Sequence, residues 1–440
     1  MFVPMFATAC RWLIPPTSPP PGRTAMTAIT ATPATAVTPA AVRAATTATY
    51  AAFIGSGFGF ASWASRIPQI RDRLDLDASA LGLVLLALAA GSLLALPLSG
   101  PVVTRAGSSR TVAAMAVLLG VGLTVAALGS LIGVVPLVIG LFLFGFAHGA
   151  WDVGMNVQGT VVERHLGRSV ISRFHAGFSL GTVAGALLGA AVVALHVPVA
   201  VHLTVVAVLV VAGVVWQARH FVADDQDPRP DLVAAARRGG ALTAWREPRT
   251  LLIGVFVLAF AFAEGVGNDW ISVAAIDGHH VSATLGALAF AGFLTAMTVG
   301  RWYGPALLGR YGRTRVVRVL AVVGIVGVAL FVFGPTPVFA YAGTLLWGLG
   351  ASLGFPVGMS AGGDDPRRAA ARVSVIASIG YCAFLAGPPV VGLLGDQVTV
   401  LRALVTVAVL LGVAALVAGS VRPLSAEGGG AAVAGVERVA

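Results

Sequence analysis

The sequence predicts an all-α membrane protein with twelve transmembrane helices, arranged as two six-helix repeats. Three observations support this prediction: the apolar composition, the regular recurrence of long apolar segments, and the placement of the arginines. Hydrophobic residues make up 57% of the 440 residues and charged residues only 10%, whereas a soluble domain usually carries about 25% charged residues. We therefore expect most of the chain to lie in a lipid bilayer.

Twelve apolar segments follow one another along the chain, each close to the length that a membrane-spanning helix needs. About 20 apolar residues at a rise of about 1.5 Å each cross a hydrocarbon core roughly 30 Å thick. The first six segments are 45–65, 80–100, 111–131, 136–159, 175–195 and 198–218. The last six are 250–270, 284–305, 315–334, 338–360, 374–395 and 400–420.

Positive charge falls mainly in alternate gaps between these segments, and arginine carries it, because the sequence has no lysine. An excess of positive charge marks the cytoplasmic loops of multi-spanning proteins. The rich gaps hold Arg105, Arg110, Arg164, Arg168, Arg173, the arginines from Arg219 to Arg249, Arg310, Arg313, Arg315, Arg318, Arg367, Arg368 and Arg372. The gaps between them hold only Arg66, Arg71, Arg73 and Arg402. We therefore expect a multi-pass protein of the plasma (inner) membrane with both termini in the cytoplasm.

Three polar stretches delimit two six-helix bundles, 43–218 and 250–422. Residues 1–42 are rich in Ala, Thr and Pro and predict a disordered cytoplasmic tail without a cleavable signal peptide. Residues 219–249 predict a central cytoplasmic loop, and residues 423–440 a second disordered tail.

Composition also argues against several classes of partner. Cys10 and Cys382 are the only cysteines, so we expect no disulfide framework, no metal site and no cofactor. A net charge of +10 is compatible with nucleic-acid binding, but the arginines lie in short loops rather than in one basic domain. The expected partners are the lipid bilayer, a small-molecule substrate and protons, and we expect a monomer.

The second half repeats short motifs of the first half at an offset of 204 or 205 residues. The pairs are Leu81-Gly82 and Leu285-Gly286, Val153-Gly154-Met155 and Val357-Gly358-Met359, Arg164/Arg168 and Arg368/Arg372, Arg105-x-Gly107-x-x-Arg110 and Arg310-x-Gly312-x-x-Arg315, and Ser169-Val-Ile and Ser374-Val-Ile. Each match alone is weak, but their common order predicts parallel six-helix repeats, which many secondary transporters share.

The loop after the second segment reads Gly100-Pro-Val-Val-Thr104-Arg105-Ala-Gly107-Ser-Ser-Arg110. It is similar to a motif of the major facilitator superfamily, which the chain resembles over all twelve segments. The resemblance implies that Gly100, Arg105, Gly107 and Arg110 belong to a gating loop, with Arg310, Gly312 and Arg315 as counterparts. In the family, an aspartate of this loop takes part in gating as a charge partner of basic groups. This chain has Thr104 at that position and Gly309 at its second-half counterpart, so the resemblance does not extend to that charge partner. Simple anchoring of the loop by its arginines is an equal alternative.

Four further motifs resemble the fucose-permease-like branch of uncharacterised bacterial inner-membrane proteins in this superfamily. They are Trp63-Ala-Ser-Arg66-Ile-Pro68, His148-Gly-Ala-Trp151-Asp152-Val-Gly-Met-Asn156-Val-Gln158, Arg173-Phe-His175 and Gly267-Asn268-Asp269-Trp270. This resemblance implies a small polar solute, such as a sugar, as the substrate.

Asp152 lies well inside the fourth segment, where an ionisable group costs about 2.5–3.5 kcal/mol and needs a partner or a watery cavity. His148, Asp152 and Asn156 follow at i, i+4 and i+8 and so share a helix face. A carboxylate beside an imidazole suits proton coupling. The second half has Ser352 and Pro356 at the positions of His148 and Asp152, so the repeat does not itself require an acid there. A structural hydrogen bond between helices is the alternative.

Other polar groups predict further contacts. Glu264 is a second proton-coupling residue by this hypothesis. Asn268, which shares its helix face, and Asn156 are candidate substrate-binding residues. Asp269 binds substrate or lies at the outer interface. Arg301 binds an anionic group or an acid, the plainer alternative being that it extends to the inner surface. The remaining hypothesis is that Trp63, Trp151 and Trp347 stack on a sugar ring, the alternative being that they pack in the protein or anchor it at the membrane interface.

These features predict a secondary active transporter of a small polar solute, working as a proton symporter by alternating access. Two alternatives remain: a proton-antiport exporter of amphipathic compounds, and a membrane solute sensor that does not transport. An enzyme is not expected. The G-x-S-x-G pattern from Gly177 to Gly181 lies on a helix face of regularly spaced glycines, not in the strand–turn–helix context that a nucleophile elbow needs.

Overall fold

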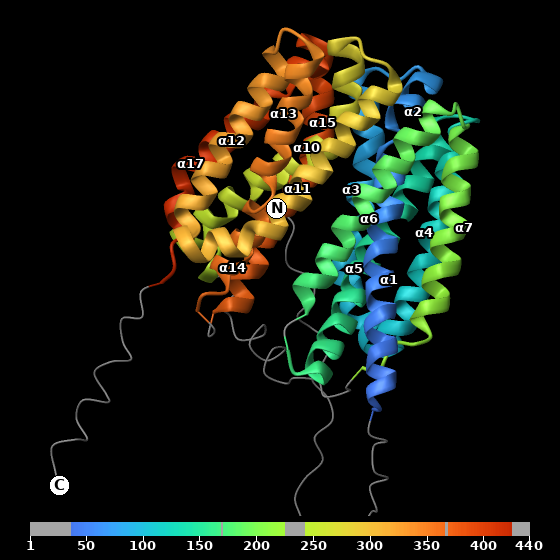
Figure 1. Ribbon diagram of the computed structural model, residues 1–440, viewed down its shortest axis with the longest axis vertical. Coiled ribbons are helices and arrows are strands. Elements are labelled where there is room, and N and C mark those ends of the chain that lie inside the picture. Colours follow the sequence, from blue (N-terminus) through green and yellow to red (C-terminus); the bar gives the residue numbers. More distant parts are fainter. Residues whose placement is uncertain (1–36, 169, 225–242, 366–367, 425–440) are drawn as a thin grey trace, which may run out of the picture. The chain divides into compact units, whose positions relative to one another are not determined.

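The computed structural model describes residues 37–168, 170–224, 243–365 and 368–424, and within these ranges the regular elements are helices (Figure 1). The first half comprises α1 (Pro39–Ala64), α2 (Ile67–Leu74), α3 (Ala78–Ala106), α4 (Ser108–Gly129), α5 (Val134–Leu166), α6 (Ile171–Ala194) and α7 (Val199–Ala218). The second half comprises α10 (Pro248–His279), α11 (Ala283–Tyr311), α12 (Arg313–Phe333), α13 (Pro337–Ala351), α14 (Gly354–Gly362), α15 (Ala369–Val398), α16 (Val400–Ala403), α17 (Val405–Val417) and the 3-10 turn η1 (Ala418–Val421).

The predicted polar stretches fall mostly outside the described residues. Of the expected first tail, 1–42, the structure describes only the last part, where α1 already begins at Pro39. The middle of the expected central loop, 225–242, and the expected tail from 425 onward also lie outside the described ranges.

Among the described residues, eleven helical spans are long and apolar enough to cross a membrane. α13 and α14 together make one of these spans, and Val400–Val421 makes another. α1 is less apolar because it is rich in Ala, Gly, Ser and Thr, but its 26 residues are long enough to cross and it packs along α6 and α7. The predicted all-α membrane fold is confirmed.

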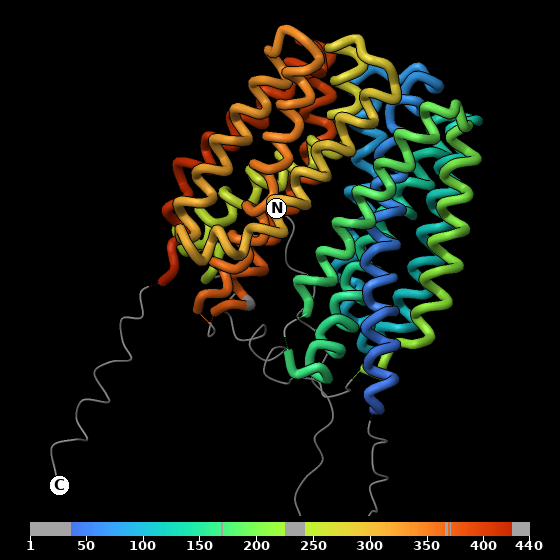
Figure 2. The backbone as a smooth tube through the Cα atoms, viewed as in Figure 1, coloured from blue at the N-terminus to red at the C-terminus, as the bar shows by residue number. Residues whose placement is uncertain are grey.

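The two halves pack their helices in the same way. Figure 2 shows the halves as two groups of helices, one blue to green and the other yellow to red. The corresponding pairs are α1–α6 and α10–α15, α3–α5 and α11–α13, α4–α5 and α12–α13, α4–α7 and α12–α17, and α1–α7 and α10–α17. The halves then meet through α3 against α15 and α6 against α11, which are themselves corresponding helices. The sequence repeat is therefore also a repeat of packing.

Glycine pairs allow the backbones to approach closely at corresponding crossings of the two halves. A Cβ on Gly122 of α4 would lie 2.5 Å from the Phe144 nitrogen of α5, and one on Gly327 of α12 would lie 2.3 Å from the Trp347 nitrogen of α13. Small residues at such crossings are typical of membrane helices, since association in lipid depends on close packing rather than on expulsion of water.

The tenth span differs from the single helix predicted for 338–360, because α13 ends at Ala351 and α14 begins at Gly354. Pro356 has no N–H, so the carbonyl of Ser352, four residues earlier, lacks its usual helical donor. That carbonyl instead accepts a hydrogen bond of 3.3 Å from Arg301 Nε. The counterpart helix α5 has Asp152 at the position of Pro356 and continues unbroken.

We predict that Gly122→Val destabilises the protein, because the new side chain would overlap the backbone of α5; overpacking costs about 1–3 kcal/mol. Gly213→Val in α7 is the matched control, since a Cβ at Gly213 meets nothing within 4 Å. Thermal unfolding of the purified protein in detergent would measure both. Equal melting temperatures for the two variants would contradict the packing argument.

Candidate functional site

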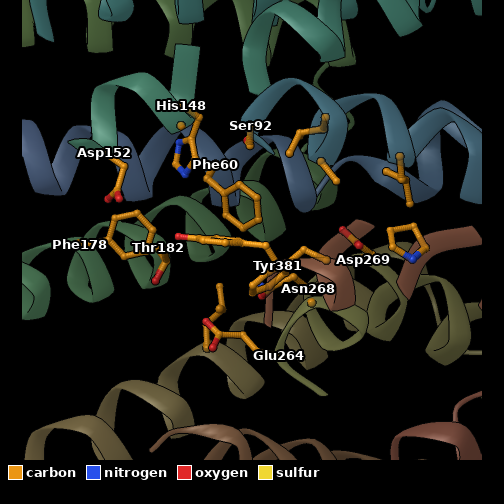
Figure 3. A pocket seen from close by; sticks show the side chains of 18 of the residues that line it. Phe60, Ser92, His148, Asp152, Phe178, Thr182, Glu264, Asn268, Asp269 and Tyr381 are labelled. Atoms are coloured by element: carbon orange, nitrogen blue, oxygen red, sulfur yellow. The ribbon is translucent and has the colours of Figure 1, made fainter. Parts of the chain in front are cut away.

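A cavity of about 270 Å³ lies between the two halves, with walls from α1, α3, α5 and α6 on one side and α10, α11 and α15 on the other (Figure 3). Most of its lining is apolar or aromatic, and a few polar side chains enter it. The polar and charged lining residues are Ser92, His148, Asp152, Ser179, Thr182, Glu264, Asn268, Asp269, Thr298, Arg301 and Tyr381. A mainly apolar cavity with a few converging polar groups is the usual form of a small-molecule site.

Asp152 projects from α5 into this cavity (Figure 3). Its Oδ1 accepts a hydrogen bond of 3.2 Å from Asn156 Nδ2, one turn further along the helix. Tyr381 of α15 is close enough across the cavity for the charge of Asp152 to act on its hydroxyl. Asp152 thus has a neutral amide as its hydrogen-bond donor and faces the opposite half of the molecule.

Asn156 does not line the cavity but orients groups that lie near it. Besides its bond to Asp152, its Oδ1 lies 3.1 Å from Nε2 of His175 on α6. The charge of Arg301, on the other half, acts on His175. Asn156 thus contacts Asp152 and α6 rather than the cavity, and its substrate-binding role stays a prediction.

His148 lines the cavity one turn before Asp152, as the spacing predicts. Its ring packs near Phe60, Phe144 and Phe178, with centroid distances of 5.7, 6.1 and 6.3 Å. Its Nδ1 lies 3.4 Å from Ser56 Oγ. Within the described part of the chain no hydrogen bond joins His148 to Asp152, so the aromatic residues fix the position of the imidazole.

Glu264 and Arg301 form a bidentate ion pair in the cavity wall, with Arg301 Nη2 at 2.8 Å from each carboxylate oxygen. The side chains are 18% and 30% exposed. Arg301 also donates to the freed carbonyl of Ser352, so three hydrogen bonds hold its guanidinium at the cavity wall.

Asp269 and Asn268 follow Glu264 along α10 and also line the cavity. The Asn268 Oδ1 atom is buried without a hydrogen-bond partner. In the described ranges, no hydrogen bond or ion pair to the Asp269 carboxylate is found. These two residues thus present polar atoms that the protein does not satisfy.

Trp63 and Trp151 do not lie at the cavity; they are 2% and 0% exposed and pack in the interior of the first half. The neighbouring Arg66 is likewise buried and donates from Nη2 to the Val197 carbonyl at 2.7 Å. Sequence reasoning missed the aromatic wall instead, which includes Phe60, Phe178, Tyr381 and Phe384. Of these four residues, only Tyr381 could have been recognised as a site residue from the sequence, because its hydroxyl is a polar group within an apolar segment.

The expected gating-loop residues lie at two corresponding helix junctions. Gly107 between α3 and α4 has φ +83° and Gly312 between α11 and α12 has φ +76°, a region that favours glycine. Arg105, Arg110, Arg310 and Arg315 are exposed, and Gly100 lies within α3 with nothing near its Cβ position.

Acids from elsewhere hold these two junctions. Asp224 accepts from the backbone nitrogen and the hydroxyl of Ser108, at the start of α4. At the corresponding position Arg313 pairs with Asp364 at 2.6 Å. An acid outside the motif thus contacts each junction, although Thr104 and Gly309 replace the acid within it.

Contacts between the halves concentrate at the end of the molecule that carries α2, here called the α2 end. Arg71 of α2 pairs with both carboxylate oxygens of Asp277 of α10. Burial lowers the pKa of Arg71, but its bonds to Asp277 and Asp72 outweigh this and raise the pKa. Asp396 of α15 accepts from the backbone nitrogens of Ala78 and Ser79 at 3.0 and 3.2 Å.

The ion pairs described at the opposite end lie within the second half. Asp364 pairs with Arg249 and Arg313, and Glu247 pairs with Arg368 and Arg372. The hydrogen bond from Arg372 holds the pKa of Glu247 below its usual value. The charged groups thus tie the two halves together at the α2 end and stiffen one half at the other end.

Comparison with known proteins places the chain among membrane transporters. The Major Facilitator Superfamily profile matches residues 49–383. An uncharacterized transporter of Sinorhizobium fredii, y4wD, is 31% identical over 79% of this chain and 90% of its own length. The nucleoside transporter NupG aligns with a TM-score of 0.67 at 16% identity, over 85% of this chain and 98% of NupG. The E. coli fucose:proton symporter FucP aligns with a TM-score of 0.54 at 15% identity, over 85% and 98%. At such identities these structures show the shared fold.

We predict that Arg301→Gln lowers the free energy of unfolding by roughly 1–3 kcal/mol, since it leaves the Glu264 carboxylate in the cavity wall without its cation. The double variant Glu264→Gln/Arg301→Gln should recover part of this loss, because it removes the unpaired charge as well. Thermal unfolding would measure both, with the exposed Arg73→Gln as a control for losing an arginine. Additive losses in the double variant would contradict the pairing.

Proposed function

The chain belongs to the major facilitator superfamily, and we propose that it is a secondary active transporter that carries a small polar solute through the cavity between its halves, coupled to protons. The family and the relatives are transporters rather than enzymes. The single observation that carries the proposal is the central cavity, which holds Asp152 from one half opposite Glu264 and Arg301 from the other. The neighbours FucP and NupG are transporters of fucose and of nucleosides, which supports a polar solute.

Asp152 is the proposed proton-coupling residue. The carboxylate of Glu264 is already neutralised by Arg301, so proton uptake there would have to break a bidentate ion pair. Within the described part of the chain, the donor to the Asp152 carboxylate is the Asn156 amide, and Asp152 is reached from the cavity. Protonation of Asp152 changes the charge at the interface of the halves, which is the change that a coupled carrier requires.

A polar chain supports communication between the two acids. It runs from Asp152 through Asn156 to His175, and the charge of Arg301 reaches His175 from the other half. Arg301 in turn holds Glu264. In this proposal, loss of the negative charge on Asp152 shifts the balance of charges around Arg301, and Glu264 has the role of second coupling acid.

The proposed transport cycle is alternating access, with one half rocking against the other. The arginine-rich end is proposed to face the cytoplasm, so the α2 end faces outward. The Arg71–Asp277 pair and the Asp396 contacts, named here the outer latch, then close the outer side. Under this orientation the structure corresponds to the state closed to the outside.

A proton-antiport exporter of amphipathic compounds is a second possibility, favoured by the largely apolar and aromatic lining of the cavity. The two proposals differ in the sign of the response to a pH gradient. An acidic exterior drives net uptake by a symporter, whereas it drives net extrusion by an antiporter.

We predict that Asp152→Asn abolishes proton-driven flux in proteoliposomes while leaving the amount of inserted protein unchanged, because the amide cannot carry the proton. Labelled fucose and labelled uridine are the first solutes to test, with and without a pH gradient. Asp75→Asn is the matched control, since Asp75 is an exposed acid in a left-handed turn that Asn also adopts. Proton-driven flux that persists in both Asp152→Asn and Glu264→Gln would refute the coupling proposal.

We predict that Arg71→Gln and Asp277→Asn each shift the population toward a state open at the α2 end, because they remove a contact between the halves. Double electron–electron resonance would measure the distance between spin labels placed in loops 75–77 and 280–282. This distance should lengthen in both variants. Arg73→Gln, an exposed neighbour on the same helix, should leave the distances unchanged. Unchanged distances in all three variants would rule out a latch at this position.

A further inference from the structure

The polar groups that face the cavity are mostly hydrogen-bond acceptors. The hydroxyls of Ser92, Thr182 and Thr298 each donate to a backbone carbonyl: Gly145 at 2.8 Å, Ser179 at 2.8 Å and Leu294 at 2.8 Å. A hydroxyl that already donates its proton in a hydrogen bond can offer only its oxygen lone pairs to a ligand. These three groups therefore act as acceptors toward anything that occupies the cavity.

The carboxylates strengthen this imbalance. Asp152, Glu264 and Asp269 line the cavity, whereas Arg301 is the single arginine or lysine in its lining. Both oxygens of Glu264 bind Arg301, so this cation and this anion neutralise each other. Asp152 and Asp269 remain, and neither has a cationic partner among the described residues.

If Asp152 carries the proton, as proposed above, Asp269 is the carboxylate left for the solute. It lies beside Asn268, whose Oδ1 is buried without a partner, and both residues line the same part of the α10 wall. A carboxylate in apolar surroundings is costly unless a cation with hydrogen-bond donors meets it. Among the residues that the structure describes, none supplies such a group there, so the solute is left to supply it.

The aromatic wall of the cavity also suits a ligand that carries a positive charge. In Figure 3 Asp152 and Asp269 lie at opposite sides of the cavity, with Phe60 and Tyr381 between them. Aromatic faces attract cations and also cover the apolar surface of a ring or chain. A solute bound there would place its charged group near Asp269 and its body against the rings.

Resting on the proposed transport function, we infer that the solute carries a protonated amine, which binds Asp269 with Asn268 as its second contact. Anionic solutes such as carboxylates and phosphates are disfavoured, because the described lining of the cavity holds one arginine, Arg301, and Glu264 already pairs with it. A bare metal cation fits less well, since it needs several more oxygen ligands than these two side chains provide. The small cavity volume limits the solute to a compact molecule.

Binding to the purified full-length protein tests this inference with matched pairs of ligands. Glucosamine is compared with glucose, and 2-phenylethylamine with 2-phenylethanol, by ligand-induced thermal stabilisation. The amine of at least one pair should bind more tightly than its neutral partner. Asp269→Asn should weaken amine binding about 10- to 100-fold, the effect of losing a hydrogen bond to a charged group.

Asp269→Glu is the conservative variant, which keeps the charge and should retain amine preference, and Asp75→Asn controls for loss of an acid elsewhere. The inference is overturned if no amine is preferred over its neutral partner, or if the preference persists in Asp269→Asn. It is also overturned if sodium ions alone give the Asp269-dependent stabilisation, because the carboxylate would then serve a metal cation.

Flux measurements separate this inference from the proposed function. Proton-driven flux of a neutral solute without amine preference would refute the amine inference and leave the transporter proposal standing. Amine binding that depends on Asp269, but without flux under any pH gradient, would refute the transporter proposal and leave the binding site standing.

Discussion

The exclusion of unpaired charge from lipid is the constraint on which this structure depends. Inside a bilayer, backbone polar groups must be satisfied within helices, and ionisable side chains must be paired or face a cavity. The ionisable residues deep in the spans obey this rule, since Asp152, Glu264, Asp269 and Arg301 all line the one large cavity described. The arginines at the helix ends obey it differently: most lie at the aqueous ends or in ion pairs. Arg66 is buried and donates a hydrogen bond to the Val197 carbonyl. The scaffold therefore concentrates the chemistry at the interface of the halves.

The repeat shows how one scaffold supports two different uses of the same position. In α5 the position holds Asp152, and the helix continues with a carboxylate facing the cavity. In the second half it holds Pro356, which breaks the span and frees the Ser352 carbonyl. That carbonyl helps to hold Arg301, which neutralises Glu264. Among the described residues, the first half thus presents Asp152 without a cation, whereas the second half presents Glu264 already paired and Asp269 without a cation. The two acids without a cation give the cavity its excess of negative charge.

Much of this arrangement could be predicted from the sequence, because a lipid bilayer requires long apolar helices and makes ionisable residues within them rare. The spans follow from length and apolar content, and the deep ionisable residues stand out against apolar neighbours; His148, Asp152, Glu264, Asn268, Asp269 and Arg301 do line the cavity. The direction in which other side chains point could not be predicted. A helix that is apolar all round has no distinct face, so Trp63 and Trp151 were as plausible in the cavity as Phe60 and Phe178, and only packing decides between them. Likewise, only the three-dimensional structure shows that three cavity hydroxyls donate to backbone carbonyls, those of Ser92, Thr182 and Thr298.

The strength of the outer latch determines how much free energy is needed to open the outer side in the proposed transport cycle. The Arg71 and Asp277 side chains are 14% and 41% exposed, and ion pairs that reach water contribute about 0.2–1 kcal/mol. The cap that Asp396 provides at the start of α3 adds roughly 0.5–2 kcal/mol, the range for helix caps. A latch of this size biases the two states by a few kcal/mol at most, whereas moving an equilibrium from one state almost fully to the other takes about 5.5 kcal/mol of differential binding. Neutralising Asp152 and seating a cation at Asp269 both act at the interface that the latch closes. Because the latch contributes only a few kcal/mol, the proposed protonation of Asp152 and binding of a cation at Asp269 need to favour the open state by only a similar amount to release it.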